Sequence, residues 1–207
     1  MNPRTAVIGF LISCPMLAAI SCYAKDNVYF DFMIEELDRA NDIISEYLGM
    51  AKDRNVNLQL QYLDQIINDI CPMIEAEANH KGMNIKLDLR KPPMLTIDKN
   101  EIRQLILNMT RNAMEAMSEG GILTIGTTEE DGDIVLFIKD QGQGIPNELN
   151  KLGTPFFTTK ENGTGLGLAV CYSIAARHNA RIECETGSKG TNFKVVFPSE
   201  DDQITLF

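Results

Sequence analysis

The hydrophobic residues of this chain change their spacing along the sequence, and the changes predict successive helices and strands. Between residues 30 and 51, apolar side chains recur at intervals of three and four positions with acidic residues opposite, which predicts an amphipathic helix. The same spacing predicts helices over 66–78, 102–117 and 168–178. Stretches that alternate or are rich in β-branched residues predict strands. These are residues 57–63, 83–89, 94–97, 123–128, 134–138, 181–185 and 192–197.

Turn and capping residues separate these segments. Asp98, with Glu101 three positions later, is typical of a capping box at the start of a helix. We expect Gly120-Gly121 to end that helix, and Asp131-Gly132-Asp133 to join two strands as a hairpin. Because helices and strands alternate, we expect an α+β fold in which a mixed sheet is covered on one face by helices, a two-layer α/β sandwich.

Composition narrows the function. The 207 residues include 19 Lys and Arg against 29 Asp and Glu, a net charge of −10, and no basic cluster is longer than a pair. Nucleic-acid binding therefore has no electrostatic support. The five cysteines are scattered without a Cys-x-x-Cys pair, which is typical of a reducing compartment. His80 and His178 stand alone, and we expect them to be surface or helix-end residues.

The strongest candidate for chemistry lies between residues 140 and 168. Asp140 follows a predicted strand, so its carboxylate could accept a hydrogen bond from an exocyclic amine. Gly142 and Gly144, which lack a Cβ, would let the backbone lie against a planar ring. A second cluster, Gly163, Gly165 and Gly167, opens a predicted helix whose N–H groups and dipole would face an anion. A nucleotide site is the interpretation, with the base at one end and phosphates at the other.

Two other phosphate-binding motifs do not fit these glycines. A dinucleotide-binding turn needs a helix directly after the glycines, which Pro146 opposes. A P-loop needs four residues between its glycines and then Lys-Ser or Lys-Thr, which neither cluster supplies.

Four motifs together resemble the ATP-binding domain that sensor histidine kinases share with type II topoisomerases and MutL. Asp140-x-Gly142-x-Gly144 and Gly163-x-Gly165-x-Gly167 match its two glycine boxes. Asn108-Met-Thr-Arg-Asn112 is similar to the asparagine box of histidine kinases, and Gly190-Thr191-Asn-Phe193 is similar to their closing element. The resemblance covers residues 57 to 198 and is strongest to the sporulation-type and nitrogen-sensor-type kinases. The acidic charge argues against the nucleic-acid-dependent relatives.

The resemblance implies roles for single residues. Asn112 is the expected Mg²⁺ ligand with Asn108 beside it, since a neutral amide oxygen suits a metal already neutralised by triphosphate. The ATPase members have a water-activating glutamate at the position of Asn108, so an amide there favours phosphoryl transfer to a side chain over hydrolysis. The expected nucleotide-binding residues are Asn108, Asn112, Asp140, Gly142, Gly144, Lys160, Gly163, Thr164, Gly165, Leu166, Gly167 and Thr191.

Four side chains near the site have narrower expectations. Lys160 could meet the β- or γ-phosphate, although a solvated lysine is an equal alternative. Phe156 and Phe157 are expected to anchor their segment on the core. By resemblance, Thr191 helps to bind the adenine through a water, and its alternative is an ordinary strand threonine.

The first residues resemble a different part of the same kinases. Asn2-Pro3-x-Thr5 is similar to the stretch just after the phospho-accepting histidine, so residues 1–53 are interpreted as a partial dimerisation hairpin and residues 54–207 as the ATP-binding catalytic domain. The acceptor histidine is then absent, and autophosphorylation in cis is not expected. An export signal over residues 5–20 is the alternative, but sixteen residues are short for a membrane span.

The resulting hypothesis is a cytoplasmic protein-histidine kinase domain of a two-component system. It would bind ATP and Mg²⁺, dimerise through the hairpin, and transfer the γ-phosphoryl group to a histidine that supplies a response regulator. Two alternatives stay open: a nonenzymatic ATP-binding interaction module, and a switch kinase of the same fold that phosphorylates serine.

Overall fold

A computed structural model describes residues 33, 34, 37, 56–90, 92–145, 151–158, 160 and 163–198. The chain divides into two compact units, Met1–Ser45 and Glu46–Phe207, and all elements below belong to the second. Of the predicted helix over 30–51, only residues 33, 34 and 37 are described, and all three are helical. The rest of the predicted hairpin and its boundary at residue 53 lie outside the described residues, so both stay predictions.

The second unit contains three helices and seven strands among its described residues. The helices are α4 (Leu63–His80), α5 (Lys99–Ala116) and α6 (Gly167–Arg177). The strands are β1 (Gln59–Gln61), β2 (Asn84–Leu89), β3 (Leu95–Ile97), β4 (Ile122–Glu130), β5 (Asp133–Lys139), β6 (Arg181–Gly187) and β7 (Gly190–Phe197).

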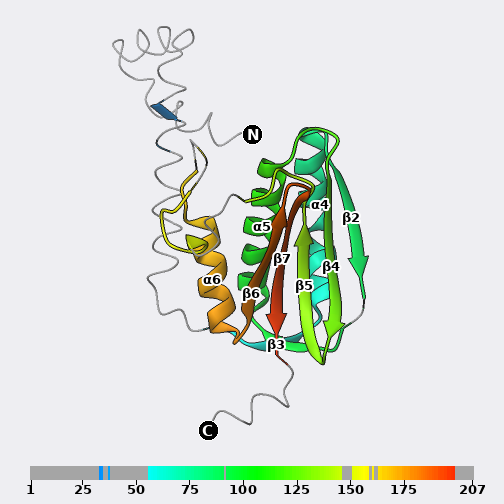
Figure 1. The fold of residues 1–207 in the computed structure, drawn as a ribbon. Coiled ribbons are helices and arrows are strands. Elements are labelled where there is room, and N and C mark those ends of the chain that lie inside the picture. Colours follow the sequence, from blue (N-terminus) through cyan, green and yellow to red (C-terminus); the bar gives the residue numbers. More distant parts are fainter. Residues whose placement is uncertain are drawn as a thin grey trace, which may run out of the picture. The chain divides into compact units, whose positions relative to one another are not determined.

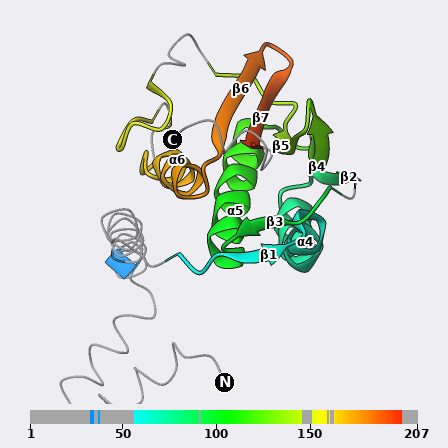
Figure 2. The same ribbon diagram turned by 90° about the horizontal axis from the view of Figure 1, so that it is seen from below.

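Five of these strands form one mixed sheet in the order β2-β4-β5-β7-β6. The pair β2 and β4 is parallel, and the other pairs are antiparallel. Figures 1 and 2 show α4, α5 and α6 side by side on one face of this sheet. The short pair of β1 and β3 lies apart from the sheet, near the beginning of α5. This is the predicted two-layer sandwich.

The core fills the space between the helices and the sheet, because each helix presents an apolar stripe to the inner side chains of the strands. The stripe of α5 is the predicted one, and all six of its members are buried: Ile102, Leu105, Ile106, Met109, Ala113 and Met117. The position of α5 under the middle of the sheet fixes where its polar side chains lie, and two of these are the predicted metal-site asparagines.

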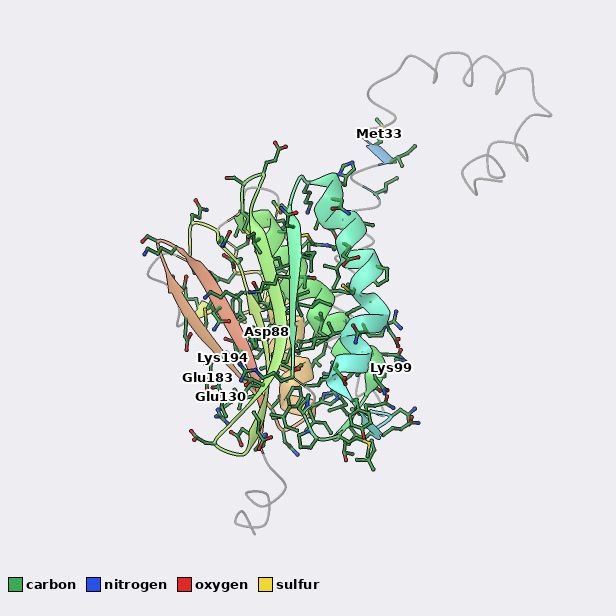
Figure 3. All side chains as sticks on the ribbon, turned by 90° about the vertical axis from the view of Figure 1, so that its right-hand side faces the viewer. Met33, Asp88, Lys99, Glu130, Glu183 and Lys194 are labelled. Atoms are coloured by element: carbon green, nitrogen blue, oxygen red, sulfur yellow. The ribbon has the colours of Figure 1, made fainter. Side chains whose placement is uncertain are left out.

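The opposite face of the sheet carries charged side chains. Figure 3 shows Glu130, Glu183 and Lys194 on the sheet side of the domain, and Lys99 on the helix side. The Lys194 ammonium lies 3.3 Å from a carboxylate oxygen of Glu130 and 3.4 Å from one of Glu185. Alternation of this kind is typical of a sheet with one face on the core and the other in solvent.

The strands and helices predicted between residues 57 and 198 are confirmed in type, and two of their ends differ from the prediction as follows. The first strand is shorter than the predicted 57–63, because residue 63 already begins α4. Helix α5 ends at Ala116 rather than at Gly120-Gly121, since Met117 is already extended, with φ −99° and ψ 157°. None of the described helices has the length and apolarity needed to cross a membrane.

Candidate functional site

Asp140 stands at the end of β5 and is only 3% exposed. Its Oδ1 accepts hydrogen bonds from the backbone N–H groups of Gly142, at 2.8 Å, and Thr191, at 3.0 Å. Burial raises the pKa of this carboxyl group, and the two hydrogen bonds lower it by less. Among the described residues, none donates a hydrogen bond to Oδ2. One carboxylate oxygen is therefore fixed by the backbone, and the other accepts no hydrogen bond from the described residues.

The glycines of the first box are required by contacts within the protein. A Cβ on Gly142 would meet the backbone carbonyl of Ala116, at the end of α5. Gly144, at φ 76°, would bring a Cβ against the carbonyl of Gly187 in the β6–β7 hairpin. The structure thus shows close approach of backbone to backbone at both glycines, and the predicted approach to a flat ring stays a prediction. The effect is to hold the Asp140 loop between a helix end and a hairpin.

Thr191 is buried in β7 beside Asp140, and its predicted role in binding adenine stays a prediction. Its backbone carbonyl accepts a hydrogen bond from Asp140 N at 2.9 Å, which completes a two-way link between β5 and β7. Its hydroxyl lies 3.1 Å from that of Thr186, and the Thr186 hydroxyl oxygen also accepts a hydrogen bond from Ile145 N at 2.8 Å. The closing motif therefore shapes the same corner as the first glycine box.

The two asparagines lie where α5 meets the beginning of α6. Asn108 donates a hydrogen bond from its amide to the carbonyl oxygen of Gly167 at 3.4 Å. The position of a Cβ on Gly167 would be 3.8 Å from Nδ2 of Asn112. Because Asn108 and Asn112 are four residues apart, both face α6. The structure thus brings the asparagine box to the last glycine of the second box.

Helix α6 begins without a capping side chain and has no acidic residue in its first turn. Neither a cap nor an acidic side chain therefore neutralises the positive end of its dipole or its first N–H groups. A helix N-terminus of this kind favours an anion. Thr164 supports the approach to this helix, because its hydroxyl oxygen accepts a hydrogen bond from Leu166 N at 3.3 Å. Leu166 itself is fully buried.

The other two glycines of this box shape the loop before α6. Gly165 has φ 68°, its carbonyl oxygen accepts a hydrogen bond from Phe156 N at 3.0 Å, and a Cβ there would collide with the Phe156 backbone. A Cβ on Gly163 would meet the Thr158 hydroxyl. The glycines let residues 155–158 pack against the loop.

Lys160 reaches the asparagine box from the segment that carries the two phenylalanines. Its ammonium donates a hydrogen bond to Oδ1 of Asn112 at 3.2 Å and forms an ion pair with the carboxylate of Glu115. Lys160 is therefore not a solvated lysine, and it lies at the predicted metal ligand. Glu115 lies three residues after Asn112 and therefore on the same helix face.

The expectation for Phe156 is wrong. Its side chain is 60% exposed and its φ is 67°, so it does not anchor its segment on the core. Phe157 is partly buried, and the Lys151 ammonium lies 5.6 Å from the centre of its ring. The φ of Phe156 is set by the backbone contact with Gly165 described above, which directs the side chain outward.

The two ends of the site are joined through α5. Ala116 contacts the Asp140 loop, and Asn112 lies one turn earlier in the same helix. At 1.5 Å per residue, these two positions are separated along the axis by about 6 Å. The Asp140 corner and the asparagine box are thus joined by one helix.

The comparisons with known sequences agree with this geometry. Residues 97–201 match the family described as "Histidine kinase-, DNA gyrase B-, and HSP90-like ATPase". Sporulation kinase A of Bacillus subtilis is 37% identical over 204 residues, which are 96% of this chain and 33% of that protein. Sporulation kinase C of the same organism is 34% identical over 206 residues, 97% of this chain and 47% of that protein. The chain thus spans less than half the length of these relatives.

Solved structures with the same fold include a full-length ShkA in complex with AMPPNP. It is 21% identical, with a TM-score of 0.73, over 82% of this chain and 38% of that chain. Histidine kinase ThkA in complex with response regulator protein TrrA is 23% identical, with a TM-score of 0.71, over 98% of this chain and 63% of that chain. At these identities the likeness concerns the fold. The family match and the sporulation kinases go further: the chain belongs to the histidine kinase-, DNA gyrase B-, and HSP90-like ATPases, and within them to the sensor histidine kinase type.

Proposed function

We propose that this domain binds ATP with Mg²⁺ and transfers the γ-phosphoryl group to a histidine in two-component signalling. The observation that carries the proposal is the carboxylate of Asp140. It is buried, one oxygen is held by two backbone N–H groups, and the other has no donor among the described residues. A buried carboxylate oxygen that has no donor of its own suits the exocyclic amine of adenine. It would repel the carbonyl oxygen that guanine carries at the same position.

The phosphate end fits a metal–triphosphate. The N-terminus of α6 offers N–H groups without a capping side chain, and Asn112 lies beside it, with Nδ2 nearest Gly167 and Oδ1 toward Lys160. Mg²⁺ retains several waters and takes few protein ligands when it is bound to phosphates, so one amide oxygen is sufficient. When bound, the metal would neutralise charge that develops on the phosphates. Asn108 would hold α6 in place through its bond to Gly167, and it cannot act as a hydrolytic base.

The acceptor is not among the two histidines of this sequence. His178 caps the end of α6 with its side chain fully buried, and its Nε2 accepts a hydrogen bond from Asp98 N. His80 ends α4, in the catalytic unit rather than in residues 1–53. We infer that the phosphorylated histidine lies in a helical hairpin outside these residues. A response regulator would then accept the phosphoryl group. We also propose that the protein dimerises through residues 1–53 and that it is cytoplasmic.

The decisive experiment supplies the acceptor. The chain is mixed with γ-labelled ATP, Mg²⁺ and a hairpin peptide that carries a His-Glu-x-x-Asn-Pro sequence, and acid-labile phosphate is measured on each component. We expect labelled hairpin and unlabelled chain. Acid-labile phosphate on this chain alone would contradict the assignment of the acceptor. Intact ATP binding without transfer to any hairpin would favour the nonenzymatic module, and acid-stable phosphoserine on an added partner would favour the serine-directed kinase.

A further inference from the structure

The ammonium of Lys160 has two partners on α5, and one of them is the proposed metal ligand. It donates a hydrogen bond to Oδ1 of Asn112 at 3.2 Å and pairs with the carboxylate of Glu115. The side chains of Lys160 and Glu115 are 38% and 40% exposed, so the pair is within reach of solvent. Among the described residues, this hydrogen bond and this ion pair are the polar interactions of the Lys160 side chain.

The Asn112 oxygen cannot serve the ammonium and a metal ion in the same way at the same time. A second cation at that oxygen would lie close to the first, and two like charges at such a distance repel each other. Mg²⁺ must therefore displace Lys160 from Asn112, whereas a phosphate group could attract the freed ammonium. Lys160 thus competes with the metal for Asn112 when no nucleotide is present.

Glu115 decides how strongly Lys160 competes. Its carboxylate is the anionic partner of the ammonium, and it lies three residues after Asn112 on the same helix face. An ion pair at a partly exposed site contributes modestly, so a metal–nucleotide complex with several negative charges is able to break it. Glu115 is exposed, and among the described residues its side chain pairs with Lys160.

We propose that Glu115 is a positioning residue: it holds Lys160 on the metal ligand Asn112 until Mg²⁺ and nucleotide arrive together. This inference rests on the proposed function, and it concerns the regulation of the same site. On this proposal, Mg²⁺ takes the place of Lys160 at Asn112 in the same step in which Lys160 turns toward the phosphates. Its consequence is that Glu115 opposes Mg²⁺ binding through Lys160, although an acidic residue near a cation would by itself attract it.

The test is a double-mutant cycle with Glu115→Gln and Lys160→Met, measured as the Mg²⁺ concentration that half-saturates the enhancement of ATP binding in calorimetry. In the presence of Lys160, we expect Glu115→Gln to lower this midpoint about twofold to fivefold, the range of a partly exposed ion pair. In the Lys160→Met background the same change should raise the midpoint or leave it unchanged, because only the direct attraction of Glu115 for the cation is then lost. Glu115→Asp should restore most of the wild-type midpoint.

The controls separate this inference from the proposed function. Glu129→Gln removes an equal charge near the C-terminal end of β4, whereas Glu115 lies in α5, before the N-terminal end of that strand. This change should leave the midpoint unchanged. Circular dichroism of every variant checks that the fold is kept. If Glu115→Gln shifts the midpoint equally with and without Lys160, the positioning role is wrong while the proposed function stands. If wild type and all variants bind ATP without any dependence on Mg²⁺, the metal site itself is wrong.

Discussion

Arg177, near the end of α6, binds Glu101, in the first turn of α5, through three hydrogen bonds. Its Nε lies 3.1 Å from both carboxylate oxygens, and its Nη2 lies 2.8 Å from Oε1. The Glu101 side chain is only 7% exposed and that of Arg177 is 23% exposed. This pair ties the two helices together at the ends opposite to those that carry Asn112 and Gly167. It therefore sets how the asparagine box and the second glycine box face each other.

Replacing Arg177 with Met should destabilise the domain by about 3 kcal/mol, because a buried carboxylate is left without its partner. Urea unfolding followed by circular dichroism measures the change. Arg181→Met is the matched control: its pairs with Asp133 and Glu183 involve a side chain that is 57% exposed, so a loss of about 0–1 kcal/mol is expected. Equal losses for the two variants would show that burial does not strengthen the Arg177 pair. Changing Glu101 to Met in the Arg177→Met background should recover stability.

The same cluster shows what a local pattern can and cannot predict. The cap was predicted correctly, since Asp98 Oδ1 accepts hydrogen bonds from Asn100 N and Glu101 N. The second half of the capping box was wrong, because Asp98 N donates to Nε2 of His178 instead of to Glu101. Spacing along one helix reveals a cap. It does not reveal a histidine and an arginine that the fold brings from the end of another helix.

Asp98→Ala should cost about 1–2 kcal/mol at neutral pH, the range for a lost N-cap. Burial raises the pKa of Asp98, but hydrogen bonds from the N–H groups of Asn57, Glu101 and Asn100 outweigh it, so the pKa is lowered from 3.8. A lowered pKa stabilises the fold above the unfolded value and loses that stabilisation as the pH falls through the folded value. The difference between wild type and variant should therefore shrink below pH 3.8. A difference that stays constant down to acidic pH would contradict the assignment.

How much of the site could be predicted from the sequence depends on the kind of residue. The hairpin turn was predictable from its residues. Asp131 and Gly132 adopt positive φ in the predicted turn, and the sequence Asp-Gly is typical of two-residue hairpin turns that require it. The end of α5 was placed too late, since Gly120 is used elsewhere: its N–H donates to the carbonyl oxygen of Gly82, between α4 and β2. The pairing of Glu115 with Lys160 could not be predicted, because the two residues are 45 positions apart in the sequence.

Asp140→Asn should weaken ATP binding and yet not weaken the fold. The amide oxygen can still accept hydrogen bonds from Gly142 N and Thr191 N, but an N–H group replaces the oxygen offered to adenine. We expect a loss of about 1–3 kcal/mol in binding free energy, measured by calorimetry. Equal affinities for ATP would remove Asp140 from the base site, and strong binding of GTP by the wild type would do the same.

The stability of this variant should depend on pH with a definite sign. Burial raises the pKa of Asp140 above 3.8, so between the unfolded and folded values the native state binds more protons than the unfolded state. Wild-type stability therefore falls as the pH rises through that window, and the uncharged amide avoids the loss. Thermal unfolding should show the variant at least as stable as wild type at pH 7, with the gap closing toward pH 3.8. A variant that is less stable at pH 7 would contradict the desolvation argument.

Asn112→Ala should abolish the Mg²⁺ dependence of ATP binding and leave the fold intact. Asn112 is partly exposed, its side chain accepts a hydrogen bond from Lys160, and alanine is the better helix former, so little stability depends on it. The loss of the amide oxygen removes the proposed metal ligand, whereas Asp140 and the N-terminus of α6 still bind base and phosphates. Calorimetry with and without Mg²⁺ should then give the same affinity for the variant. Asn100→Ala, the same change in the first turn of α5, should keep the wild-type dependence; if Asn112→Ala keeps it too, the metal is held by other groups and Lys160 is not its competitor.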